Sequence, residues 1–310
     1  MPWRNKMKAA TICLLVCLAP FFSVAGARSD STAVFKAAFL SGEWQPYVMQ
    51  STDYALNGPD TTFLQRLTAS VDVVVTDSTA DRYMLTWRFH DFAIETDSRL
   101  LKAVVAKAEP VTVTCLVSPV GILREFLNWS SLTTCLDEAL KAELPSYALR
   151  SDSAAKREIE RLYAFRSGLE GLLLRSIRLF HQLHGYGYDL GVVVDVPTLL
   201  ALPGLTDQVP GTVRKRLDVL DEGTAVVSTV SVPDTTHLKA LLTRIKPTRE
   251  ESDALLATKM TGSTVFDLKT GWVFYTFEAL EQAIDQVNTG QLLELTHSST
   301  YNSLHYEHDH

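Results

Sequence analysis

The longest uninterrupted helical pattern in the sequence runs from Ser151 to His184 and constrains the fold more than any other part. Residues 151–153 (Ser-Asp-Ser) suit an N-cap, and Gly185 provides a C-terminal stop. Charged residues fall mostly on one side of the pattern. The apolar residues recur every three or four positions, as on the buried face of a helix; they are Ile159, Leu162, Leu169, Leu173, Ile177, Phe180 and Leu183.

Two glycines, Gly168 and Gly171, interrupt this helical pattern. Glycine in a helix interior costs about 1 kcal/mol relative to alanine, so another interaction must offset the loss. Two explanations are open: a close approach of the helix to a sheet, or a ligand that lies against bare backbone. The helix exit at residues 184–188 (His-Gly-Tyr-Gly-Tyr) is similarly ambiguous between a binding loop and a helix stop whose tyrosines fill the edge of a core.

Alternating segments rich in β-branched and aromatic residues predict strands on both sides of this helix. The first two are expected to form an antiparallel hairpin that turns at residues 77–81. The expected strands are 61–76, 82–95, 111–117, 188–196, 212–220, 224–232, 264–268, 272–277 and 291–300. Residues 277–287 are also taken as strand, although their apolar spacing suits a helix. Shorter helices are expected at 131–144, ending at Pro145, and at 236–245 and 249–259.

Strands, then helices, then strands again predict an α+β fold. We expect curved, mainly antiparallel β-sheet packed against one long central helix and shorter helices. No linker, low-complexity tract or internal repeat divides the chain. Residues 28–310 are therefore interpreted as a single β-rich domain with a helical middle at about 131–184.

The first 27 residues have the three parts of a secretory signal peptide. Three basic residues open it, residues 9–24 are mostly apolar, and Ala-Gly-Ala at 25–27 suits cleavage before Arg28. The apolar part contains Pro20 and is shorter than the roughly 20 residues that a membrane-spanning helix needs. The sequence predicts export to the periplasm or the extracellular space, with no transmembrane segment in the mature chain.

Removal of this peptide would change the formal charge from −7 to −10 and leave two cysteines, Cys115 and Cys135. The acidic balance, without a basic cluster, argues against nucleic acid as a partner. In an oxidising compartment the two cysteines are a candidate disulfide, which would close a loop of about twenty residues and contribute roughly 3 kcal/mol. Two buried thiols are the alternative.

One pair of short motifs suggests catalysis. Residues 153–156 (Ser-Ala-Ala-Lys) and 269–271 (Lys-Thr-Gly) are similar to elements of penicillin-binding proteins and serine β-lactamases, in which such a serine is the nucleophile and its lysine assists deprotonation. No Ser-x-Asn element lies between them, and a helix cap and a hairpin turn explain both. A serine hydrolase using Ser153 and Lys156 is therefore kept as an alternative. The sequence lacks a Gly-x-Ser-x-Gly elbow, a phosphate loop, a dinucleotide fingerprint and a His-Glu-x-x-His zinc helix.

Two groups of histidines are candidate metal ligands. His181 and His184 share a helix face near Asp189, but histidines at a helix C-terminus commonly satisfy its carbonyl groups. Residues 304–310 (Leu-His-Tyr-Glu-His-Asp-His) could bind zinc, nickel or copper weakly, but a solvated tail is the simpler interpretation. The sequence predicts no metal and no cofactor.

Residues 76–89 and 262–273 resemble segments of exported, β-rich envelope proteins of Gram-negative bacteria that have no assigned function. The resemblance implies a non-enzymatic envelope protein. We expect it to bind an apolar small molecule or an envelope protein between the sheet and the long helix, or else to serve as a structural or assembly component. The expected lining residues are Trp87, Phe89, Leu173, Phe180, Tyr186, Tyr188 and Trp272.

Overall fold

The computed structural model describes residues 32–57, 60–128, 134–149, 152–200, 202, 208–245, 252, 255–284 and 287–298. The predicted signal peptide and the His-rich tail at 304–310, with His305, His308 and His310, lie outside the described residues.

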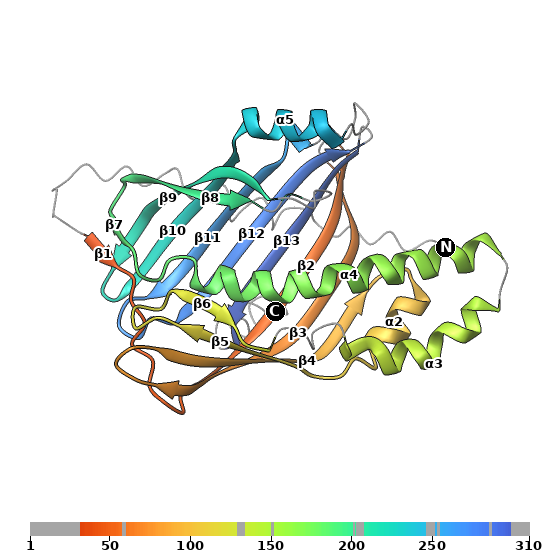
Figure 1. Cartoon of the computed structure of the whole chain (residues 1–310), viewed down its shortest axis with the longest axis horizontal. Coiled ribbons are helices and arrows are strands. Elements are labelled where there is room, and N and C mark those ends of the chain that lie inside the picture. The colour runs from red at the N-terminus through yellow and green to blue at the C-terminus, as the bar shows by residue number, and fades with distance from the viewer. Residues whose placement is uncertain are drawn as a thin grey trace, which may run out of the picture.

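An eleven-stranded antiparallel sheet dominates the protein (Figure 1). Its strands lie in the order β6-β5-β4-β3-β2-β13-β12-β11-β10-β9-β8, so the N-terminal strand β2 pairs with the C-terminal strand β13. The short strands β1 (Thr32–Val34) and β7 (Gly187–Asp189) form a separate pair. The strands of the large sheet are β2 (Trp44–Asn57), β3 (Asp60–Ser78), β4 (Tyr83–Glu95), β5 (Val111–Val117), β6 (Leu123–Phe126), β8 (Val193–Leu200), β9 (Val209–Asp221), β10 (Thr224–Pro233), β11 (Lys259–Asp267), β12 (Val273–Ile284) and β13 (Val287–His297).

Four helices are described: α2 (Arg99–Val105), α3 (Asp137–Ala148), α4 (Ser153–His181) and α5 (Thr235–Ile245). The sheet-rich α+β class is thus confirmed, but a curved sheet around one central helix is not. The N-terminal part of α4 packs beside α2 and α3, and a later part lies over β12 and β13 (Figure 1). None of the described helices has the length and hydropathy of a membrane span.

The helix α4 forms where its sequence pattern predicts it. The Asp152 carboxylate caps its first turn by accepting a hydrogen bond from the Ala155 amide at 2.7 Å. Just beyond its end, Gly185 has a φ of +82°, a left-handed conformation that glycine adopts without strain. The apolar stripe of α4 is buried, with Leu162, Ile177 and Phe180 each 0% exposed.

The predicted hairpin of β3 and β4 is confirmed, and its alternation explains the main core. Leu85, Trp87 and Phe89 lie on one face of β4 and are each 0% exposed, opposite Val75, Val73 and Val71 of β3. These side chains pack against the buried stripe of α4. Burial of large aromatic and β-branched side chains on one sheet face is the principal stabilising contribution.

Three local predictions differ from the structure. The helix α3 begins later than expected and continues through Pro145, which lacks the N–H that would donate to the Lys141 carbonyl. The strand expected at 188–196 is two strands, β7 and β8, because Gly191 turns the chain with a φ of +76°. The helix α2 was not expected; Ser98 caps it by accepting from the Leu101 amide at 3.1 Å.

Candidate functional site

Six of the seven residues predicted to line a binding cavity form the core instead. Trp87, Phe89, Leu173, Phe180, Tyr188 and Trp272 are between 0% and 3% exposed. The ring of Phe180 packs at right angles to that of Trp87, with centroids 5.2 Å apart, and lies 5.9 Å from that of Trp272. Only Tyr186 is exposed, at 42%, and its ring lies 5.0 Å from the Lys215 ammonium. The buried side chains therefore occupy the space between the sheet and the C-terminal half of α4.

A groove opens beside this core, between another side of α4 and the same face of the sheet. Its volume is about 1610 Å³, larger than the roughly 300–1,000 Å³ of typical small-molecule pockets. The side chains of α4 that line it recur every three or four residues, so they form a second stripe next to the buried one. This stripe consists of Arg161, Ala164, Phe165, Gly168, Leu169, Gly171, Leu172, Arg175, Arg178 and Leu179, and it is continued by the C-cap residue Gln182.

The two helix glycines face this groove. A Cβ atom built on Gly168 or Gly171 would have no atom within 4 Å outside the helix backbone. The helix therefore makes no close approach at these positions, and that explanation for the glycines is wrong. The bare helix backbone is instead exposed to the groove, which leaves the ligand explanation open.

The register of the sheet places one row of opposed residues along the groove, because directly opposed residues in antiparallel strands share a face. From β3 to β9 the row consists of Gln65, Asp53, Gln291, Leu280, Met260, Ser231 and Val213. All of them except Leu280 line the groove. Met49 lies four residues before Asp53 on the same face of β2, and it is buried in the core. The same sheet face thus changes from core to groove over about two pleats.

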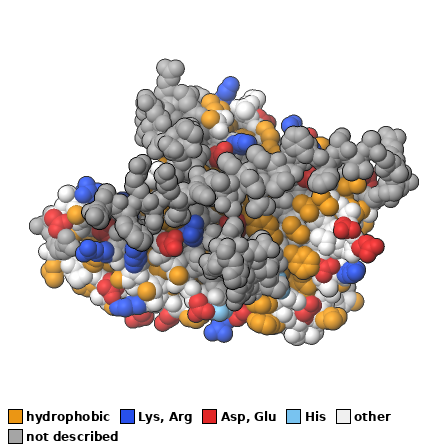
Figure 2. Space-filling view, turned by 180° about the vertical axis from the view of Figure 1, so that it is seen from behind, with side chains coloured by type: hydrophobic (Ala, Val, Ile, Leu, Met, Phe, Trp, Pro, Cys, Tyr) orange, Lys and Arg blue, Asp and Glu red, His pale blue; other side chains and the backbone are white. Residues whose placement is uncertain are grey.

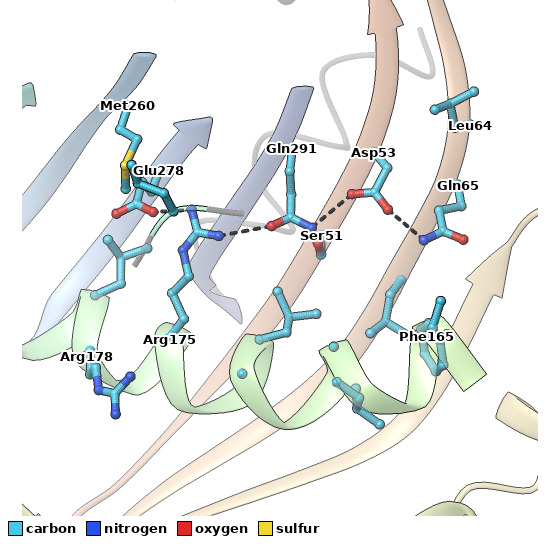
Figure 3. A pocket seen from close by; sticks show the side chains of 18 of the residues that line it. Ser51, Asp53, Leu64, Gln65, Phe165, Arg175, Arg178, Met260, Glu278 and Gln291 are labelled. Carbon is cyan, nitrogen blue, oxygen red and sulfur yellow. Dashed lines mark hydrogen bonds and ion pairs between the residues drawn. The ribbon is translucent and has the colours of Figure 1, made fainter. Parts of the chain in front are cut away.

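A chain of polar contacts crosses the middle of the groove (Figure 3). Arg175 of α4 forms an ion pair with Glu278 of β12 and donates to the Gln291 side-chain oxygen at 2.9 Å. The Gln291 amide donates in turn to Asp53 at 3.0 Å, and the Gln65 amide donates to the other oxygen of Asp53 at 2.6 Å. This polar chain is the Arg175–Asp53 network, made of Arg175, Glu278, Gln291, Asp53 and Gln65.

Apolar side chains flank the Arg175–Asp53 network on both sides. Toward β3, β4 and α2 the groove is lined by Phe63, Leu64, Leu67, Ile94, Leu101 and Phe165, of which Phe63 and Leu64 are 43% and 47% exposed. Toward β8 and β9 it is lined by Leu199, Leu200, Leu202 and Val213, with Leu199 59% exposed. The site is therefore amphipathic along its length.

The two motifs considered for catalysis lie at opposite ends of α4. Ser153 is the first residue of the helix, and Lys156 is exposed 3.9 Å from Glu160. Residues 269–271 form the turn between β11 and β12, where the Gly271 carbonyl accepts from His184, beyond the other end of the helix. A helix of this length extends about 40 Å. The structure does not bring these two elements into one site.

His181 and His184 are buried beside the end of α4. His181 Nδ1 lies 2.9 Å from the Gly121 carbonyl, and His184 Nε2 lies 2.9 Å from the Gly271 carbonyl. Burial lowers the pKa of both imidazoles, that of His184 to about 4. Asp189 hydrogen-bonds to Thr32 instead of to the histidines. Among the described residues no group of three His, Cys, Asp or Glu side chains is arranged to hold a metal ion.

Cys115 and Cys135 are both buried thiols and are not bonded to each other, so the disulfide alternative is not realised in the structure. Burial raises the pKa of Cys115 to about 12 and that of Cys135 to about 11. Protonated, buried thiols are poor nucleophiles. Neither cysteine lines the groove.

Lys215 and most of the groove residues were not predicted from the sequence. Lys215 is only 6% exposed, and its ammonium donates to the Gln182 carbonyl at 2.6 Å, which satisfies the end of α4. Burial lowers its pKa to about 8. The alternation of Val213, Lys215 and Leu217 along β9 places the lysine on the inward face, and this pattern could have indicated its burial. No comparable sequence signal identifies Asp53, Gln65 and Gln291 as neighbours.

No protein-family model matches the chain, and no curated protein is significantly similar to it. Figure 2 shows the opposite side of the molecule, where described side chains of both charge signs are interspersed with hydrophobic ones. The groove between α4 and the sheet is therefore the feature that bears most directly on function.

Proposed function

We propose that this is an exported, non-enzymatic protein that binds an elongated, partly apolar small molecule in the groove between α4 and the sheet. The observation that carries the proposal is the stripe of bare helix backbone at Gly168 and Gly171, which faces open space. Glycine is costly inside a helix, and close approach of a ligand to backbone is one use that offsets this cost.

The shape of the groove supports an elongated ligand. Its lining residues on α4 run from Arg161 to Gln182, which corresponds to about 30 Å at 1.5 Å per residue. Exposed Phe63, Leu64 and Leu199 offer apolar contact at its two ends. Large exposed apolar side chains gathered in a concave site are typical of ligand-binding surfaces.

The signal-like N-terminus at residues 1–27 supports export, and the segments that resemble envelope proteins support a place in the bacterial envelope. In that setting the ligand would be a molecule of the periplasm or the extracellular space. A structural component of the envelope without a ligand is the competing function.

Titration with the neutral fluorophore N-phenyl-1-naphthylamine tests the proposal. We expect saturable binding to the mature protein, and loss of at least tenfold in affinity when Leu side chains fill the groove in the double variant G168L/G171L. A Cβ atom at either position meets no atom within 4 Å outside the helix backbone, so the added side chains extend into the groove. Thermal unfolding measured by circular dichroism checks that the variant stays folded.

The matched control is S167L, which places the same side chain on an exposed position of α4 outside the groove lining. It should bind the fluorophore as the parent protein does. Equal binding by all three proteins would contradict the proposal. Native mass spectrometry of protein purified from its own envelope then identifies the natural ligand, and a co-purifying protein in its place would favour the structural function.

A further inference from the structure

The Arg175–Asp53 network carries a net negative charge inside the groove. Glu278 and Asp53 are carboxylates, and Arg175 is the cation that balances one of them through its ion pair with Glu278. Among the described residues, the Asp53 carboxylate accepts from the side-chain amides of Gln65 and Gln291. Within the described part of the chain no lysine or arginine forms an ion pair with Asp53 (Figure 3).

The network also has more unused acceptors than donors. A carboxylate offers about four acceptor sites, and the guanidinium five donors. Asp53 uses two of its sites and Glu278 uses one, which leaves about five on the two carboxylates. Arg175 uses two of its donors, which leaves about three. The Gln65 and Gln291 side chains add about three unused acceptor sites and about two unused N–H donors, so acceptors stay in excess. A ligand group that completes this network is therefore a donor with positive charge.

Apolar surface lies beside the Asp53 carboxylate. Leu64 is the sequence neighbour of Gln65 on β3, and it lines the groove together with Phe165 of α4 (Figure 3). Gly168 and Gly171 leave open space along the same stripe of α4. An alkyl chain that lies against this surface brings a polar end group to Asp53.

We infer that the groove selects amphiphiles that carry an ammonium group, with the ammonium on Asp53 and the apolar chain between Leu64 and the glycine stripe of α4. This inference rests on the proposed function, since it assigns the chemical class of the ligand in the same groove. Charge-assisted hydrogen bonds from an ammonium to a half-buried carboxylate give such a preference.

Three probes with one alkyl chain test the inference: dodecylammonium, dodecanol and dodecanoate, used below their micellar concentrations to displace N-phenyl-1-naphthylamine. We expect dodecylammonium to displace the fluorophore at a concentration at least tenfold lower than dodecanol, and dodecanoate to be the weakest. In D53N the preference for dodecylammonium over dodecanol should fall to less than twofold.

Two further variants complete the test. D81N removes the same charge from the exposed turn between β3 and β4 and should leave the preference unchanged. R175Q removes the cation that balances Glu278 and should increase dodecylammonium affinity several-fold, a gain that an unfolded variant cannot produce. Equal displacement by all three probes, or a preference for dodecanoate, would overturn the inference while leaving the groove as a binding site. Absence of any fluorophore binding would instead overturn the proposed function.

Discussion

Replacing the two groove glycines with alanine should make the protein more stable and a poorer binder. Alanine is favoured over glycine by about 0.8–1.0 kcal/mol at an interior helix position. A Cβ atom at Gly168 or Gly171 meets no atom within 4 Å outside the helix backbone, so no steric cost offsets this gain. The double variant G168A/G171A is therefore expected to gain about 2 kcal/mol in its free energy of unfolding.

Urea denaturation followed by circular dichroism measures this gain as a higher midpoint with an unchanged slope. The control is S167A on the same helix, where the Ser167 hydroxyl bonds to the Ala164 carbonyl and lies outside the groove lining. It should gain less than 1 kcal/mol and keep its affinity for N-phenyl-1-naphthylamine. The glycine variant should lose affinity two- to tenfold, because each methyl group occupies ligand space. A variant that is less stable than the parent would refute the open geometry at these glycines.

Two other predictions concern the core. Burial lowers the pKa of His184 from 6.5 to about 4. As the pH falls, the unfolded chain therefore binds a proton at this histidine before the folded protein does. The free energy of unfolding should be unaffected above pH 6.5 and fall by about 3 kcal/mol toward pH 4. Urea midpoints at pH 7 and pH 5 check this, and H184Q should reduce the difference while the contribution of buried His181 remains. The buried thiols of Cys115 and Cys135 should resist Ellman's reagent in the folded mature protein at pH 8 and titrate as two thiols after unreduced denaturation. A count of zero thiols would establish the disulfide.

Helix α4 and the β3–β4 hairpin could be predicted because both depend on local periodicity. The spacing of Leu162, Leu173 and Phe180 identifies one buried helix face without knowledge of what covers it. The turn at residues 77–81 between two alternating segments sets the pairing of β3 with β4. Residues 277–284 are an exception to this local reasoning, because their apolar spacing suits a helix, yet they belong to β12 as expected.

The site itself could not be predicted in this way. Trp87, Phe180 and Trp272 were selected because aromatic side chains often line cavities, but aromatic side chains more often fill cores, and these do. The polar residues at the centre of the groove are ordinary side chains that come mostly from distant strands. Asp53 and Gln291 become neighbours only because β2 pairs with β13 in one particular register.

The sequence alone determined the long amphipathic helix, the strand-rich segments around it and the signal-like N-terminus, because each is encoded by neighbouring residues. Only the tertiary structure decided what Gly168 and Gly171 face. Their surroundings depend on how far α4 stands from the sheet, and that distance is set by side chains of strands that are far apart in the chain. The groove and its polar centre are consequences of sheet register, which no local pattern specifies.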